Sequence, residues 1–168
     1  MNKLLKALRN PDLIPRFLWK KASPLIKNDE FYLRVNYLLD RKKVLHLNNP
    51  IRFNEKLQWL KLNVHKPERS NLVDKYECKK IIAERVGKQY VIPTLGVWND
   101  FDEIDFNALP DKFVLKCNHG CAYNIVCNDK TEFDRIKAKK QLNTWLKEDF
   151  GAFNIEPHYS NIKKHKIT

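Results

Sequence analysis

Two short apolar runs on either side of a small loop constrain the fold of this chain most. The runs read "KFVLKC" and "YNIVC", and the loop between them reads "NHGCA". Runs of this length and composition around a glycine-containing loop are typical of a β-hairpin. Because side chains alternate along a strand, Phe113, Leu115 and Cys117 share one face, which we expect to pack against helices. Val114, Lys116 and Asn118 lie on the other face, with Lys116 at the mouth of the loop.

This hairpin has two interpretations. Backbone N–H groups of a glycine-containing turn can hold phosphate oxygens, and Lys116 would then supply positive charge beside them. A plain hairpin with one surface lysine gives the same pattern. The loop has a single glycine, Gly120, so its composition does not separate the two.

Several other segments show hydrophobic residues at helical spacing, which predicts helices with extended connections. The expected N-terminal caps of three of these helices are Asn54, Asn71 and Thr131. Two helices are expected to end just before a glycine, Gly87 and Gly151. "YVIPTLGVW" is predicted to be extended, and the fold class is therefore α+β. The predicted helices cover residues 3–9, 29–47 and 52–63, a stretch between Asn71 and Gly87, and a stretch between Thr131 and Gly151.

We expect these helices to bury the apolar residues that recur at helical spacing. In the helix over 29–47 these residues are Phe31, Val35, Leu38 and Leu39. In the helix over 52–63 they are Leu57 and Leu60, with Trp59 beside them. The later helices offer Cys78, Ile81, Ile82 and Val86, then Leu142, Trp145, Leu146 and Phe150.

Positive charge is concentrated at the N-terminus. The chain carries a formal net charge of +12, and residues 1–28 hold seven Lys and Arg against Asp12, so 7 − 1 = +6. A solvated arm explains this pattern, and so does a surface that meets anionic lipid or an acidic polymer. Leu4, Leu5 and Leu8 on one helical face favour weak association with an anionic membrane. The chain has no nucleic-acid-binding motif, so we expect no specific nucleic-acid partner.

The chain has four cysteines, Cys78, Cys117, Cys121 and Cys127. With His119, the last three suggest a zinc site, but C-x-H-x-C-x5-C is not a usual zinc spacing. Cys117 and Cys127 are also expected to point into the core, so no zinc is predicted. A nucleophilic pair of Cys121 and His119 has no further support. With no signal peptide or apolar run long enough to span a membrane, the sequence predicts a cytoplasmic protein, peripheral to the membrane through its arm.

Several motifs in order resemble the TupA-like ATP-grasp proteins of bacterial surface-polysaccharide gene clusters. They are "NPIRFNEKLQWLKL", "DKYECKKIIAERVG", "YVIPTLGVW", "IDFNALPDKFVLKCNHG" and "NIVCNDK". The resemblance runs from about Leu47 to Phe150. It implies the small N-terminal lobe of an ATP-grasp fold, with short antiparallel strands and flanking helices.

The resemblance also implies a nucleotide site for ATP with Mg²⁺. Its expected contacts are Lys75, which follows an aspartate at a helix start, and Lys116, His119 and Gly120 of the hairpin. The catalytic residues are not assigned. ATP-grasp enzymes usually join a carboxylate to an amine through an acyl-phosphate, so ligase-like chemistry in capsule or surface-polysaccharide biosynthesis is implied. A glycosyltransferase-type biosynthetic protein and a non-catalytic basic module remain alternatives.

Two departures from the family pattern affect these expectations. The loop reads "NHGCAYN" where the family typically has "NHGSGxN", so Ala122 replaces a second glycine. The C-terminal lobe that holds the Mg²⁺ ligands would begin near Ile167, where this sequence stops. We therefore expect a basic helical segment over 1–48, the lobe over 49–150, and over 151–168 the start of a missing second lobe. Self-association or docking of that lobe would complete the protein.

Overall fold

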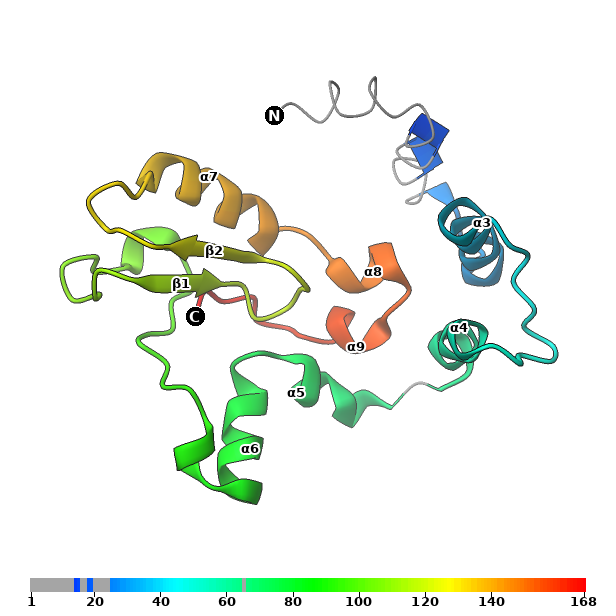
Figure 1. The fold of residues 1–168 in the computed structure, drawn as a ribbon, viewed down its shortest axis with the longest axis horizontal. Coiled ribbons are helices and arrows are strands. Elements are labelled where there is room, and N and C mark those ends of the chain that lie inside the picture. The colour runs from blue at the N-terminus through cyan, green and yellow to red at the C-terminus, as the bar shows by residue number, and fades with distance from the viewer. Residues whose placement is uncertain (1–13, 16–17, 20–24, 65) are drawn as a thin grey trace. The chain divides into compact units, whose positions relative to one another are not determined.

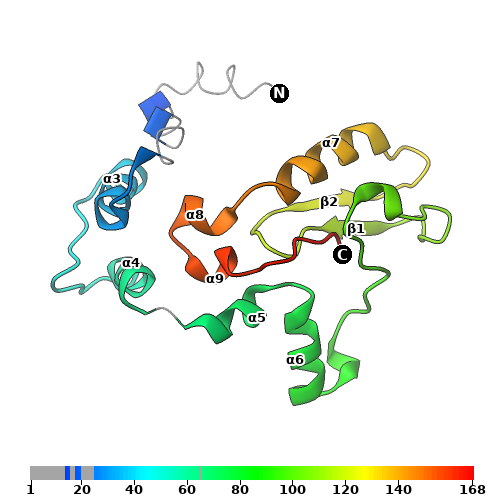
Figure 2. The same cartoon turned by 180° about the vertical axis from the view of Figure 1, so that it is seen from behind.

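The computed structural model describes residues 14–15, 18–19, 25–64 and 66–168, and divides the chain into two compact units (Figures 1 and 2). The first unit is Met1–His65 with Phe153–Ile155, and the second is Lys66–Ala152 with Glu156–Thr168. The domain boundary predicted between residues 48 and 49 is not tested by this division and stays a prediction. In chain order the elements are α3 (Asp29–Arg41), α4 (Phe53–Asn63), η2 (Pro67–Arg69), α5 (Ser70–Val73), α6 (Glu77–Val86), η3 (Lys88–Tyr90), η4 (Phe101–Glu103), β1 (Phe113–Lys116), β2 (Asn124–Cys127), α7 (Arg135–Leu146), α8 (Phe150–Asn154) and α9 (Pro157–Ser160).

The predicted hairpin is present. β1 and β2 pair antiparallel, with Phe113 opposite Cys127 and Lys116 opposite Asn124. Burial alternates as predicted along β1, because Phe113, Leu115 and Cys117 are all buried while Lys116 is exposed. The prediction is wrong for Asn118, which was expected on the outward face and is buried, because its side-chain amide hydrogen-bonds inside the protein. Helices together with a two-stranded antiparallel sheet confirm the α+β class.

The segment at residues 166–168 pairs with the free edge of β1. Lys116 and Thr168 exchange both backbone hydrogen bonds, at 2.9 and 2.8 Å, and the Asn118 N–H donates to the Lys166 carbonyl at 3.0 Å. On its other side, Ile167 exchanges two backbone hydrogen bonds with Trp98. The Ile167 side chain is fully buried. This segment is therefore part of the core of the second unit (Figures 1 and 2).

Helix α7 covers the buried face of the hairpin. Ala138 and Leu142 from this helix belong to one core cluster with Leu115 and Cys117. Aromatic rings close one end of that cluster, where Phe106 lies within 6.2 Å of three other rings, measured between centroids. The rings are Phe101, Phe113 and Phe133.

Helix α3 buries a different face from the predicted one. Tyr32, Leu33 and Tyr37 are buried, whereas Phe31 and Leu38 are about half exposed. Leu33 and Tyr37 pack with Leu45 and Leu47, which lie in the segment that follows the helix. The tyrosines, which the prediction left out, therefore supply much of the core of the first unit. The helix also ends early, at Arg41, because Lys42 takes a left-handed conformation.

The predicted helix caps are wrong at three positions. Asn54 lies inside α4, where the carboxylate of Glu55 accepts the N–H groups of Ile51 and Arg52 instead. For α6 the capping acceptor is Asp74, not Asn71, and for α7 it is Asp134, not Thr131. For α6 and α7 a carboxylate nearer to the free N–H groups takes the position, whereas the N-cap residue of α4 is Arg52. A charged acceptor there also complements the positive end of the helix dipole.

Other predictions need smaller corrections. Gly151 does not follow the last helix but lies within α8, after α7 has ended at Leu146. Residues 91–97 form neither helix nor strand, and Trp98 makes one bridge to Ile167. The helix predicted over residues 3–9, with Leu4, Leu5 and Leu8, lies outside the described residues.

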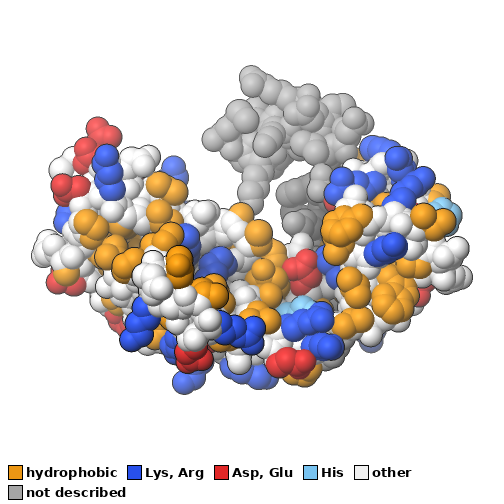
Figure 3. Space-filling model, turned by 60° about the horizontal axis from the view of Figure 1, so that its bottom comes forward, with side chains coloured by type: hydrophobic (Ala, Val, Ile, Leu, Met, Phe, Trp, Pro, Cys, Tyr) orange, Lys and Arg blue, Asp and Glu red, His pale blue; other side chains and the backbone are white. Residues whose placement is uncertain are grey.

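Some apolar residues expected in the core lie at the surface. Leu57 and Leu60 of α4 are 38% and 42% exposed, and Ile82 and Val86 of α6 are 44% and 55% exposed. Figure 3 shows hydrophobic side chains at the surface among lysines and arginines. Within the described residues, every helix falls short of the length and apolar character that a membrane crossing requires.

The core position of Leu142 makes a stability prediction. Its side chain is fully buried between α7 and the hairpin, so Leu142→Ala should lower the free energy of unfolding by about 2–5 kcal/mol. Ile136→Ala, on the same helix but 85% exposed, should change it by less than about 0.5 kcal/mol. Urea unfolding followed by circular dichroism measures both. Equal effects of the two substitutions would contradict this description of the core.

Candidate functional site

A buried amide side chain organises the loop between β1 and β2. Asn118 is 1% exposed, and its Nδ2 donates to Asp74 Oδ2 at 2.8 Å and to the Lys164 carbonyl at 3.0 Å. Its Oδ1 accepts the Lys166 N–H at 2.8 Å. The start of the loop, the start of α6 and the C-terminal segment are therefore joined by one side chain.

Asp74 places the predicted lysine beside this network. Its Oδ1 accepts the N–H groups of Tyr76 and Glu77, which begin α6, while its Oδ2 accepts Asn118. The next residue, Lys75, donates its backbone N–H to the Asn118 carbonyl at 3.1 Å. The Lys75 side chain is thereby directed at the hairpin loop.

The ammonium group of Lys75 binds the backbone of that loop. Its Nζ donates to the carbonyl of Cys117 at 3.1 Å and to the carbonyl of Gly120. Burial lowers the pKa of Lys75, and the nearby positive charge of Lys116 acts in the same direction. The structure thus brings Lys75 to Gly120, with Lys116 on the adjoining strand.

His119 points into the protein. It is 1% exposed, its Nε2 lies 2.9 Å from the Trp145 carbonyl, and its ring stacks on His165 with centroids 3.5 Å apart. Burial, together with the adjacent His165, lowers the pKa of His119 to about 4. The geometry gives the His119 ring a structural role in fixing the loop, while its predicted nucleotide contact stays a prediction.

The rest of the loop is shaped by Tyr123. Its ring stacks on Trp145 with centroids 5.1 Å apart, and its hydroxyl donates to the Glu148 carboxylate. A Cβ at position 120 would overlap this ring, which requires glycine there. Ala122 has φ 61°, in the left-handed region where alanine costs about 1 kcal/mol more than glycine.

Lys116 has two lysine neighbours near this loop, Lys75 and Lys79. The positive charge of Lys116 lowers the pKa of Lys75 and also that of Lys79, for each of which burial is the largest cause. Lys79 donates its Nζ to the Ile92 carbonyl at 3.0 Å and to Thr94 Oγ1 at 2.9 Å. Repulsion between three ammonium groups is relieved when an anion with several oxygens binds among them.

An apolar surface adjoins the lysines. Val114 and Val126 are cross-strand partners on the same outward face of the hairpin as Lys116, and they are 38% and 57% exposed. A flat apolar group could therefore lie on this pair while its charged end reaches the lysines. The arrangement can hold a polyanion with an aromatic or apolar portion.

Metal-ligating side chains are not gathered here. Cys117 and Cys127 are buried as predicted, and burial raises the pKa of Cys117 to about 12. Among the residues that the structure describes, no three His, Cys, Asp or Glu side chains lie close enough to hold a metal ion. The expected absence of zinc stays a prediction.

Sequence reasoning missed four residues that build this site. Lys79 is one helical turn after Lys75, so the spacing K-x-x-x-K within "DKYECKK" was an available signal. Asp74 was noted only as the aspartate before Lys75, and not as the cap that orients Lys75. His165 and Glu148 carry no local signal, because their partners lie 46 and 25 residues away.

A two-stranded hairpin with flanking helices, an exposed strand lysine and a second lysine in the turn before α6 fit the small lobe of an ATP-grasp fold. The family model of the TupA-like ATPgrasp proteins matches residues 55–168, more than half of the chain. The protein therefore belongs to the TupA-like ATP-grasp family, as its sequence motifs suggested. No significant match was found among curated proteins or among solved structures.

The environment of His119 makes a pH prediction. Its pKa is about 4 in the folded chain and about 6.5 when the ring is free in water. Between these values the unfolded chain binds a proton that the folded chain does not, so stability should fall as the pH drops from about 6.5 to 4. The His119 ring resonances should not titrate between pH 7 and 5 in the folded protein. A midpoint near 6.5 would contradict the buried, neutral ring.

Proposed function

We propose that this chain is the ATP-binding lobe of an ATP-grasp ligase-like protein in bacterial capsule or surface-polysaccharide biosynthesis. Membership of the TupA-like ATP-grasp family supports the nucleotide and the ligase-like chemistry. The observation that carries the proposal is that Lys75 binds the hairpin loop at the carbonyls of Cys117 and Gly120, while Lys116 is exposed on the adjoining strand. The polysaccharide context rests on the resemblance of the motifs.

The lysines and the hairpin have separate tasks in this proposal. Lys116 is exposed and has a side chain free to reach a phosphate, so it is the primary phosphate contact. Lys75 keeps the loop carbonyls of Cys117 and Gly120 together and adds charge from behind the loop. The adenine base lies on Val114 and Val126, which bury apolar surface when it binds.

When bound, ATP supplies the phosphoryl group that activates a carboxylate. The described residues of this chain orient that nucleotide and neutralise part of its charge. They do not include a cluster of carboxylates that fits Mg²⁺, so we assign no metal ligand to this lobe. A second lobe or a second protein would complete the site by supplying those ligands.

The proposal predicts that Lys116 is needed for nucleotide binding. Titration of ATP into the isotope-labelled chain should shift backbone amide signals at residues 116–124 and near Lys75. Lys116→Met should weaken this binding about tenfold or more, because it removes a charge-assisted contact to phosphate. Lys112→Met removes the same charge from an exposed position just before β1 and is the control.

The outcomes separate a site from general attraction between charges. Equal weakening by the two substitutions would show that ATP meets the net positive charge of the chain and not a site. Shifts restricted to residues 1–28 would favour the alternative, a basic module that binds anionic surfaces. Either result alone would refute a nucleotide site at the hairpin.

The biosynthetic context has its own test. Deleting the gene in a bacterium that carries it should lower the amount of surface polysaccharide, measured by sugar analysis of extracted cell envelopes. The unaltered gene should restore the amount, and the Lys116→Met gene should not. Unchanged polysaccharide in the deletion strain would exclude this context while leaving nucleotide binding intact.

A further inference from the structure

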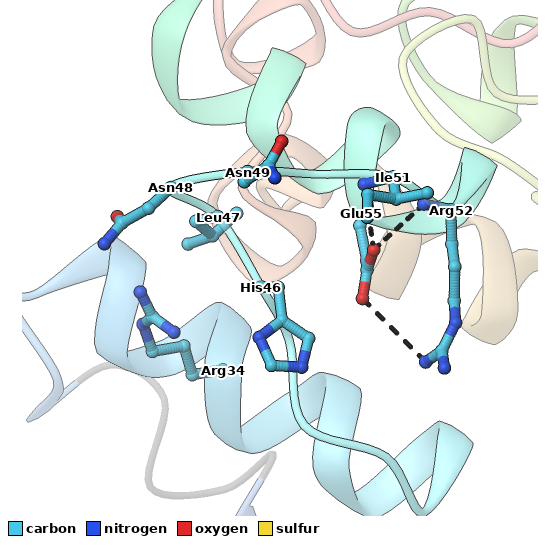
Figure 4. Close-up of a pocket in the computed structure, with 8 residues that line it drawn as sticks. All are labelled: Arg34, His46, Leu47, Asn48, Asn49, Ile51, Arg52 and Glu55. Carbon is cyan, nitrogen blue, oxygen red and sulfur yellow. Dashed lines mark hydrogen bonds and ion pairs between the residues drawn. The ribbon is translucent and has the colours of Figure 1, made fainter.

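The first unit holds a pocket that is separate from the lysine cluster. It has a volume of about 580 Å³ and lies between α3, the segment after it and the start of α4 (Figure 4). Every residue that lines it belongs to the first unit, and most of them are polar. They are Arg34, His46, Leu47, Asn48, Asn49, Ile51, Arg52 and Glu55.

Glu55 is the buried acceptor of this pocket. Its side chain is 3% exposed, and its Oε2 accepts the N–H groups of Arg52 at 2.9 Å and Ile51 at 3.2 Å. The hydrogen bond from Arg52 is the largest cause that lowers the pKa of Glu55, so the carboxyl is ionised at neutral pH. Its Oε1 is buried and has no hydrogen-bond partner.

An ionised, buried oxygen without a hydrogen bond costs free energy until a donor reaches it. The nearest cation is Arg52, whose Nη1 lies 3.9 Å from Oε1, too far for a hydrogen bond. Its side chain is 55% exposed and free to turn toward a ligand. Figure 4 shows the Glu55 carboxylate and the Arg52 guanidinium on the same side of the pocket.

The other lining groups favour negative charge. Arg34 binds Glu30 at 2.6 Å and donates to the Leu45 carbonyl at 2.8 Å, so its guanidinium is fixed in place. The His46 ring and the side-chain amides of Asn48 and Asn49 add further hydrogen-bonding groups. The pocket thus combines one unsatisfied acceptor, on Glu55, with one mobile cation, on Arg52.

These two features select a class of ligand. A simple anion would be attracted by Arg52 but repelled by the free oxygen of Glu55. A simple cation would satisfy Glu55 but would leave the positive charge of Arg52 without a partner, because Arg34 alone is paired with another carboxylate, that of Glu30. A molecule that carries both charges a few ångströms apart satisfies both groups.

We propose that this pocket binds a small zwitterion of the α-amino-acid class, with its ammonium on Glu55 Oε1 and its carboxylate on Arg52. The inference depends on the first unit alone and does not require nucleotide binding. The two asparagine amides would contact the side chain of the ligand.

The test compares three probes of nearly equal size. L-Glutamine carries both charges, 4-carbamoylbutanoate lacks the ammonium, and 4-aminobutanamide lacks the carboxylate. Titrated into the full isotope-labelled chain, L-glutamine should produce saturable shifts in residues 46–55 and in the Asn48 and Asn49 side-chain amides. Each of the other two probes should bind at least about tenfold more weakly, because each loses one charge-assisted contact.

Two substitutions and a control assign the contacts. Arg52→Gln should weaken L-glutamine binding about tenfold or more, whereas Lys56→Gln, the same charge change at an exposed position outside the pocket, should not. Glu55→Gln keeps an acceptor for the α4 N–H groups and replaces the free oxygen by a donor, so it should also abolish binding. If that variant does not fold, the comparison of the three probes tests the same contact.

Several results would overturn the proposal. They are the absence of saturable shifts with L-glutamine, equal binding of the three probes, and equal weakening by Arg52→Gln and Lys56→Gln. Loss of ATP binding in Lys116→Met has no bearing on it, so this inference and the proposed function can fail independently.

Discussion

The hydrogen bonds of the Asn118 side chain are the constraint on which the second unit depends. One amide joins the aspartate that begins α6, the carbonyl of Lys164 and the N–H of Lys166. Each such hydrogen bond contributes about 0.5–1.5 kcal/mol net, but a buried group that loses its partner costs about 1–3 kcal/mol. Without Asn118, three polar groups from two distant segments would lose partners together. The position of Lys75, which follows Asp74, depends on the same amide.

This constraint decides how the predicted phosphate loop can move. Its first part is held by Lys75 at the carbonyls of Cys117 and Gly120 and by the stacking of His119 on His165. Cys121 and Ala122 are exposed, so movement is easiest at this tip. A left-handed alanine is stiffer than the glycine that the family pattern has there, which narrows that movement. The proposed phosphate contact therefore depends on Lys116 more than on a large closure of the loop.

The sequence predicted the hairpin because strand alternation is local, and four residues on each strand suffice to show it. It failed for α3, where Phe31 and Leu38 have helical spacing but are exposed, while Tyr32 and Tyr37 are buried. A prediction of the buried helix face from hydrophobic spacing favours the most hydrophobic side chains. It undervalues tyrosine, whose ring can fill a core. The candidate lysines came from motif resemblance, and their convergence could not be derived because Asn118 joins segments 44–48 residues apart. The cap errors at α6 and α7 share one cause, since Asn and Thr fit the cap pattern but nearby carboxylates take the N–H groups at the helix start.

The network around Asn118 and the pocket around Glu55 differ in how many of their polar side-chain atoms have a hydrogen-bond partner, and that difference bears on function. The side chains of Asp74 and Asn118 have partners for each of their oxygens, so they fix the fold and leave ligand contacts to the exposed Lys116. Glu55 has the same helix-capping task as Asp74, yet one of its two oxygens is buried without a hydrogen bond. Capping alone needs one oxygen, and Asp134 performs it for α7 from the surface. Burial of Glu55 Oε1 without a hydrogen bond adds a free-energy cost that capping does not require. A ligand that donates a hydrogen bond to this oxygen would remove that cost.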